Sequence, residues 1–312
     1  MTSLNRALDT TSSSVRAGIT GKRRDVPGVT FQLLLLGSLL FSLAVLFILV
    51  ADVLGKAIPV FAERGVDFLT SPLSSNPAKA GVAQGIVGTA ILGAIVALLA
   101  FPFGLATAIY LEEYASDTRL TQFIQVNIRN LAGVPSVVYG LLGLSVFVAL
   151  MSSLNDDGSG RNIIAGGMTL AVLVLPIVII TSIEALRAVP IAIREAGYGV
   201  GASRWEVVSQ LVLPSAAPGV LTGTVLALSR ALGETAPLIL AGAVLGSFSG
   251  LNISTLFTGS YTALPVIVYD WSRKPQEAFR ADAAAAIVVL LVITLFANGI
   301  AIYLRNRYER AW

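Results

Sequence analysis

The sequence contains no cysteine and no histidine, and charged residues make up only 12% of its 312 residues. Without cysteine, the chain cannot form disulfide bonds or thiolate metal sites. Without histidine, it lacks the commonest general base, the commonest metal ligand and any imidazole proton relay. The apolar segments also lack a plausible cluster of carboxylates. We therefore expect no catalytic residue and no metal site, and an intramembrane enzyme is disfavoured.

Apolar residues dominate instead, at 55% of the chain, which indicates an all-α polytopic membrane protein. A bilayer-spanning helix needs about 20 apolar residues. Residues 1–28 are polar and predict a tail, and residues 29–308 predict a transmembrane domain. The stretches that qualify as six transmembrane helices are 29–54, 84–110, 132–152, 163–186, 217–245 and 283–304.

Basic residues predict the orientation, because cytoplasmic loops carry an excess of lysine and arginine. One side receives thirteen of them: Arg6, Arg16, Lys22, Arg23, Arg24, Arg119, Arg129, Arg187, Arg194, Arg204, Arg305, Arg307 and Arg310. The other side receives seven: Lys56, Arg64, Lys79, Arg161, Arg273, Lys274 and Arg280. Both termini and the loop 187–216 are thus predicted to be cytoplasmic. The net charge of +3 is slight, and we expect no nucleic-acid partner.

The loop 187–216 predicts two short helices. Pro190 suits the first turn of one, and Ser203 with Glu206 predicts a capping box that opens the other. Gly199 and Gly201 lie between them, where a reversal favours positive φ. Trp205, Val208 and Val212 are expected near one face of the second helix. Such a loop is shaped to fill a groove on another protein, although it could also lie on the lipid surface.

The same loop resembles the EAA motif of ABC importer permeases: E-A-A, three residues, Gly, nine residues, an aliphatic residue, one residue, Leu-Pro. The matching positions are Glu195, Ala196, Gly197, Gly201, Leu211, Leu213 and Pro214. Gly197 replaces the second alanine, and Leu211 replaces the usual isoleucine. The resemblance implies a type I ABC importer permease (MetI-like) fold. It also implies that the loop docks into a cytoplasmic ATPase and transmits its closure to the membrane helices.

Arg230 and Glu234 lie in the middle of the predicted fifth helix. Charges at that depth are costly and seldom face lipid, and their i,i+4 spacing allows them to pair. Arg230 could offer its guanidinium to an anion on the translocation path. Alternatively, the pair could only fix helix packing or join two subunits, and a gating pair fits either role. Pro176 and Pro237 are expected to kink the fourth and fifth helices.

The stretch Gly233-Glu-Thr-Ala-Pro-Leu238 resembles the signature of PstA-type permeases of the phosphate ABC importer, and Asn130–Leu144 resembles both phosphate permease types. The similarity spans about 84–304. It implies a second, PstC-type permease, a PstB-type ATPase dimer that binds ATP-Mg, and an extracytoplasmic PstS-type phosphate-binding protein. This chain would then bind no cofactor, reside in the bacterial inner membrane and pass phosphate inward by alternating access.

Three other functions stay open. The chain could be the PstC-type sister subunit, since the two types share motifs. It could be an ABC permease for another oxyanion, because specificity mostly resides in the binding protein. A stand-alone secondary transporter or channel is disfavoured by the EAA-like loop and by the absence of an inverted repeat.

Overall fold

The computed structural model describes residues 26–154, 160–243 and 259–308. All regular elements within these ranges are helical, which confirms the predicted all-α class. The helices are α2 (Val26–Thr70), η1 (Pro77–Lys79), α3 (Ala83–Ile109), η2 (Tyr110–Tyr114), α4 (Arg119–Ala132), α5 (Ser136–Leu142), η3 (Gly143–Val148), α6 (Ala149–Leu154), α7 (Ile163–Arg187), α8 (Ile191–Gly199), α9 (Arg204–Glu206), η4 (Val207–Val212), α10 (Leu213–Gly233), α11 (Ala236–Leu240), α13 (Leu264–Arg273) and α14 (Glu277–Tyr308).

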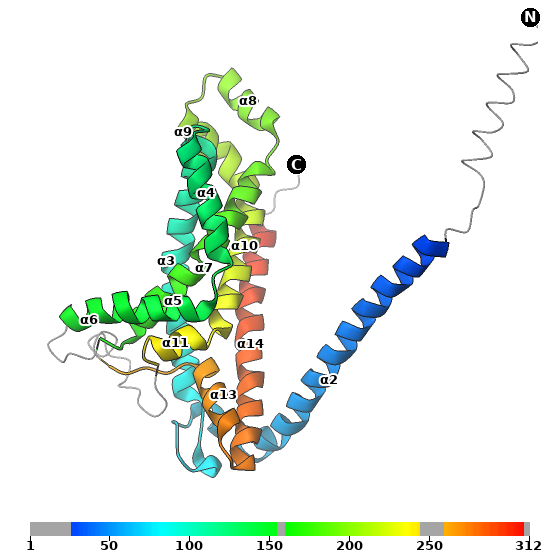
Figure 1. The fold of residues 1–312 in the computed structure, drawn as a ribbon, viewed down its shortest axis with the longest axis vertical. Coiled ribbons are helices and arrows are strands. Elements are labelled where there is room, and N and C mark those ends of the chain that lie inside the picture. Colours follow the sequence, from blue (N-terminus) through cyan, green and yellow to red (C-terminus); the bar gives the residue numbers. More distant parts are fainter. Residues whose placement is uncertain (1–25, 155–159, 244–258, 309–312) are drawn as a thin grey trace, which may run out of the picture. The chain divides into compact units, whose positions relative to one another are not determined.

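By its contacts the chain divides into two units, Met1–Asp52 and Val53–Trp312. In the first unit the structure describes one helical stretch, the part of α2 from Val26 to Asp52, whose large apolar side chains are exposed. The predicted polar tail, 1–28, falls almost wholly outside the described residues. The second unit holds the remaining elements, and its helices are shown in Figure 1.

The core of the second unit lies between α3, α7 and α10. Buried aliphatic side chains from these helices form one cluster, which includes Leu92, Val96, Leu170, Val174 and Ala227. Gly219 and Gly223, spaced as G-x-x-x-G, allow close approach of α10 to α7, because a Cβ at Gly223 would lie 2.1 Å from Thr181 Oγ1. Lipid provides no hydrophobic driving force between helices, so their association depends on close packing, which small residues allow.

Among the described residues, six helices are long and apolar enough to cross a membrane, as predicted. They are Val26–Thr70, Ala83–Tyr114, Ser136–Leu154, Ile163–Arg187, Arg204–Gly233 and Glu277–Arg307. The first is longer than the predicted 29–54 and contains one non-helical residue, Gly65.

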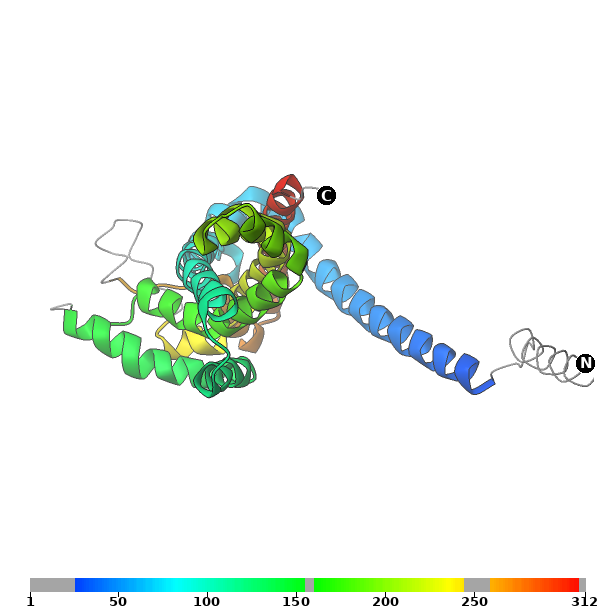
Figure 2. The ribbon, with the colours of Figure 1, turned by 90° about the horizontal axis from the view of Figure 1, so that it is seen from above.

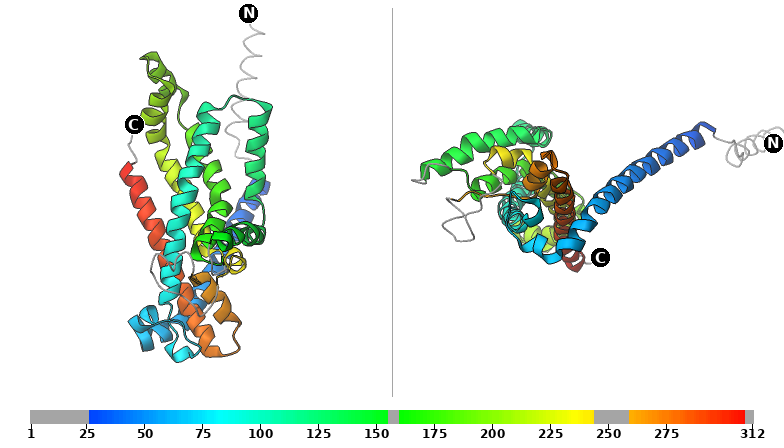
Figure 3. Two further views of the ribbon diagram at one scale, coloured as in Figure 1. Left: turned by 90° about the vertical axis from the view of Figure 1, so that its left-hand side faces the viewer. Right: turned by 90° about the horizontal axis from the view of Figure 1, so that it is seen from below.

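The third of these helices, formed by α5, η3 and α6, lies across the direction of α3, α7 and α14 (Figures 1 and 3) and extends sideways in Figure 2. The turn occurs at Gly133–Pro135, where α4 ends and α5 begins. Pro135 has no backbone N–H and disfavours helical φ/ψ in the preceding residue. The third span therefore begins at Ser136 rather than at the predicted residue 132, and the amphipathic α4 precedes it as a separate helix.

Near the junction of α13 and α14, the second unit contains a compact aromatic cluster. Trp271 and Phe279 are buried beside Phe68, and Arg64 forms an ion pair with Asp282. Tyr261 is also buried and packs against Gly166 in α7, whereas Tyr269 is exposed. Two of the three aromatic residues between 259 and 273 are therefore buried within the second unit.

Several basic residues of the second unit lie at helix ends: Arg119 begins α4, Arg187 ends α7, Arg204 begins α9, Arg273 ends α13, and Arg280 lies in the first turn of α14. Which of these ends face the cytoplasm stays a prediction.

Candidate functional site

The EAA-like loop forms α8 and α9, joined by a sharp reversal. Pro190 is the N-cap of α8 rather than a residue of its first turn. Gly201 has φ +84°, a conformation that glycine adopts without steric cost, whereas Gly199 is helical. Ser203 caps α9 through the predicted box: its backbone N–H donates to Glu206 Oε2 at 2.7 Å, and the Glu206 backbone N–H donates to Ser203 Oγ at 3.4 Å.

The absence of a side chain at Gly197 lets α8 pack closely on η4. This glycine is buried, and a Cβ there would lie 2.8 Å from both Leu211 Cδ1 and Val207 Cγ2. The departure from the second alanine of the EAA pattern therefore allows α8 to pack closely on η4. The other motif residues are distributed around this contact, with Glu195, Ala196 and Pro214 exposed and Leu211 and Leu213 partly buried.

The apolar surface of the loop differs from the expectation. Val208 and Val212 are buried, but Trp205 is 65% exposed and lies apart from them. The reason is that η4 is a π-helical segment, so the α-helical period does not extend from Trp205 to Val212. The exposed apolar side chains are Ile191, Tyr198, Val200 and Trp205, and we call these four the loop surface.

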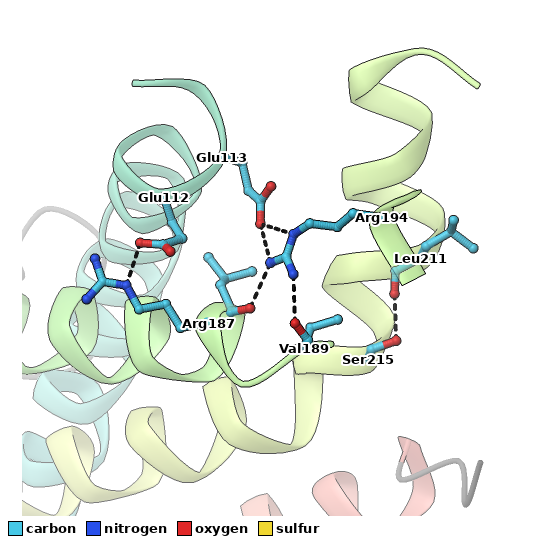
Figure 4. A network of polar contacts seen from close by, with 8 residues as sticks. Glu112, Glu113, Arg187, Val189, Arg194, Leu211 and Ser215 are labelled. Atoms are coloured by element: carbon cyan, nitrogen blue, oxygen red, sulfur yellow. Dashed lines mark hydrogen bonds and ion pairs between the residues drawn. The ribbon is translucent and has the colours of Figure 1, made fainter. Parts of the chain in front are cut away.

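Three basic residues connect the loop to the end of α3, and Figure 4 shows two of these contacts. Arg187 Nε donates to Glu112 Oε2 at 2.9 Å, and Arg194 Nη2 donates to Glu113 Oε1 at 2.7 Å. The Arg204 guanidinium lies 5.0 Å from the centroid of the Tyr114 ring. The acceptors Glu112 and Glu113 were not among the predicted residues. The signal was available, because Glu112 and Glu113 end an apolar stretch on the side assigned to these arginines.

Arg230 and Glu234 are brought together as their spacing predicts. Arg230 Nε and Glu234 Oε1 are 3.4 Å apart, and the arginine side chain is 43% exposed within the chain. The helix does not continue through them, because α10 ends at Gly233 and Glu234 has extended backbone angles (φ −76°, ψ 128°). Pro237 lies in the first turn of α11. The pair thus marks a complete break in the chain's fifth span, which was predicted to run to residue 245 with a kink.

A second broken element packs against this one. At Gly140 in α5, a Cβ would lie 2.8 Å from Pro237 Cα, so α5 and α11 are in direct backbone contact. Tyr139, also in α5, is buried, and its hydroxyl donates to Leu131 O at 2.8 Å. The helix α5, which begins after the turn at Gly133–Pro135, therefore packs on α11, which begins just after the break at Glu234.

Comparison with known proteins places this arrangement in a family. The family described as "Binding-protein-dependent transport system inner membrane component" matches residues 100–310. That is more than half of the chain. The chain belongs to this family.

The permease resembles several curated relatives. It is 30% identical to the phosphate transport system permease protein PstA of Mycobacterium leprae, over 93% of this chain and 94% of the relative. It is 33% identical to PstA 1 of Mycobacterium tuberculosis strain H37Rv, over 69% and 67%. The phosphate transport system permease protein PstC of Mesorhizobium japonicum is 31% identical, over 82% and 85%.

Solved structures share the fold at low sequence identity. A bacterial ABC transporter for the acidic polysaccharide alginate matches with TM-score 0.60 and 15% identity, covering 92% of this chain and all of that one. The MetNI methionine ABC transporter matches with TM-score 0.58 and 15% identity, covering 73% and 96%. These matches confirm the MetI-like fold of an ABC importer permease.

The remaining predicted residues of the permease lie apart from the loop. Pro176 is buried inside α7, which continues from Ile163 to Arg187 as one helix. No group of three or more carboxylates that could hold a metal ion occurs among the described residues. Within that part of the chain, the two candidate functional regions are the loop with its contacts to α3 and the break at Arg230–Glu234.

Proposed function

We propose that this permease carries inorganic phosphate into the cytoplasm as the PstA-type subunit of an ATP-driven importer. Its partners would be a PstC-type permease, a PstB-type ATPase dimer and a PstS-type binding protein that delivers phosphate from outside the cytoplasmic membrane. The single observation that carries the proposal is the similarity to PstA of M. leprae over nearly the whole of both chains.

The loop surface supports docking of an ATPase. Ile191, Tyr198, Val200 and Trp205 expose apolar area on a rigid helix-turn-helix, which suits a groove on a partner protein better than water. Gly197 and the capping box fix the shape of this surface. We propose that the ATPase binds here, that it holds the ATP-Mg, and that the permease chain itself needs no cofactor.

The break at Arg230–Glu234 supports a role in anion passage. Arg230 is half-exposed within the chain although it lies in an apolar helix, and its guanidinium can bind oxyanions through a planar fork of donors. Phosphate carries one to two negative charges near neutral pH, and a low-dielectric path strengthens its attraction to a single cation. Glu234 offers Arg230 a competing partner, which favours release of the anion.

The mechanism that follows is alternating access. Binding of ATP closes the ATPase dimer and moves the loop, the membrane helices open outward to accept phosphate, and hydrolysis resets them. The direct test is phosphate uptake by the complete complex in proteoliposomes. We expect uptake that requires ATP and the binding protein and persists when ion gradients are dissipated. Uptake that follows an ion gradient without ATP would contradict the proposal.

The identity of the cargo needs its own comparison. The same proteoliposomes, loaded with binding protein, should take up labelled phosphate in the presence of excess sulfate but not in the presence of excess unlabelled phosphate. Inhibition by another oxyanion at equal concentration would instead indicate a permease for that anion.

A further inference from the structure

Glu113 is a buried carboxylate at the end of α3. It belongs to the π-helical turn η2, and its side chain is only 7% exposed. A buried charge is costly unless a partner with good geometry neutralises it. The position of Glu113 therefore depends on Arg194, its partner in α8.

Arg194 makes a dense set of contacts for a residue next to the EAA-like motif. Its Nε and Nη2 donate to Glu113 Oε1 at 3.3 and 2.7 Å. Its Nη1 donates to Val189 O at 2.7 Å, and its Nη2 also donates to Leu186 O at 2.9 Å. Leu186 O lies in the last turn of α7, where it also accepts the Val189 N–H at 3.3 Å, and Val189 O lies just beyond the helix. A cation is favourable at this end of a helix. One guanidinium thus joins α8, α7 and the end of α3 (Figure 4).

The neighbouring ion pair, Arg187–Glu112, connects the same region but is built differently. Its side chains are 41% and 19% exposed, against 18% and 7% for Arg194 and Glu113. Exposed ion pairs of this kind contribute little to stability, because water screens the charges and both side chains lose conformational entropy on pairing. Glu112 is therefore a control for Glu113, because the two consecutive glutamates differ in burial and in the number of contacts that their arginines make.

A movement where α8 contacts α7 and η2 would shift the membrane helices, because α3 and α7 are closely packed. A Cβ at Gly104 in α3 would lie 2.6 Å from Val178 Cγ1 in α7, so the two helices touch near their cytoplasmic halves as oriented from the sequence. Packed elements of this kind shift together rather than deform separately.

We propose that Arg194 and Glu113 are positioning residues that lock α8 to the ends of α3 and α7, so that a movement of α8 becomes a movement of the membrane helices. We call this pair the coupling clamp. The proposal rests on the proposed function, because it requires an ATPase that moves α8. Loss of the clamp leaves the loop surface able to bind and stimulate the ATPase while its movement is no longer passed to the bundle.

The test compares Glu113→Gln with Glu112→Gln in purified, reconstituted complexes. For each we measure phosphate taken up per ATP hydrolysed, together with the amount of ATPase bound. We expect Glu113→Gln to lower the ratio at least about fivefold, the lower range of a typical coupling effect, with the ATPase still bound. Glu112→Gln should stay within about twofold of the wild type, as expected for an exposed pair. Equal ratios for Glu113→Gln and wild type would overturn the proposal.

A second readout needs no cargo. Because the chain has no cysteine, Ser116→Cys and Ala192→Cys can carry spin labels beside the end of α3 and on α8. We expect one narrow distance distribution in every nucleotide state, which broadens in Glu113→Gln and not in Glu112→Gln. An unchanged distribution in Glu113→Gln would overturn the clamp.

The two proposals fail separately. If the wild-type complex takes up no phosphate, the proposed function fails, and the distance measurement alone then decides the clamp. If Glu113→Gln cannot be purified with the ATPase, Arg194→Lys replaces it, since lysine keeps the charge but lacks the fork that reaches Leu186 and Val189. A wild-type uptake ratio and a narrow distribution in Arg194→Lys would overturn the proposal.

Discussion

At the scale of single residues, the structure explains why glycine occupies a position where the EAA pattern has alanine. Gly197 lies where α8 crosses η4, and any side chain would meet Val207 and Leu211. Gly199, two residues further along the same helix, has open space around it. Two glycines in one short helix thus have different tolerance for a side chain.

We predict that Gly197→Val separates α8 from η4 and destabilises the loop by about 1–3 kcal/mol, the usual cost of overpacking. The retained amount of ATPase in a pull-down should fall, because the loop surface changes shape. Gly199→Ala is the control, and it should bind the ATPase as the wild type does, since alanine favours helix and meets no neighbour. Normal ATPase binding by Gly197→Val would refute the packing argument.

At the scale of elements, interruptions of the α-helices position several of the residues to which we assign roles. The π-helical segments η2 and η4 place Glu113 toward Arg194 and turn Trp205 away from the buried Val208. The break after Gly233 leaves Arg230 and Glu234 paired at a helix end. Each of these three interruptions lies at or beside a residue to which we assign a role.

We predict that Trp205→Ala weakens binding of the ATPase by about 2 kcal/mol or more, roughly 30-fold, as expected for a central aromatic anchor. The melting temperature of the isolated permease should not change, because Trp205 is 65% exposed. Gln210→Ala, also exposed on the same arm, is the matched control. A parallel loss of stability in Trp205→Ala would mean that the side chain supports the fold rather than the partner.

Some features of these elements could be predicted from the sequence and others could not. The capping box, the reversal at Gly201 and the Arg230–Glu234 contact follow from local spacing, and local spacing predicted them. The turn at Gly133–Pro135 has a local cause in Pro135, which the search for apolar stretches did not use. The burial of Trp271 depends on tertiary packing, and the exposure of Trp205 depends on a π-helical turn. Simple periodicity contains neither, because it assumes a constant 3.6 residues per turn. Glu113 was missed because its partner is 81 residues away.

At the scale of the whole molecule, the second unit separates its regions along the bundle. The loop and the coupling clamp lie at one end, the aromatic cluster of Trp271 and Phe279 lies toward the other, and the helix break at Arg230 belongs to the apolar bundle itself (Figure 1). A permease that passes a signal from an ATPase to a cargo path needs this order of parts. Membership of the permease family and the MetI-like fold agree with it.

The measurement that tests the central claim most directly is phosphate uptake by cells carrying Arg230→Ala, with the membrane abundance of the permease quantified alongside. We predict a loss of uptake of about tenfold or more at normal abundance, the effect of removing hydrogen bonds to a charged group. Arg230→Lys should retain part of the uptake, since it keeps the charge. Normal phosphate uptake by Arg230→Ala, with any second copy of the permease removed, or an equal fall in uptake and abundance, would contradict the account.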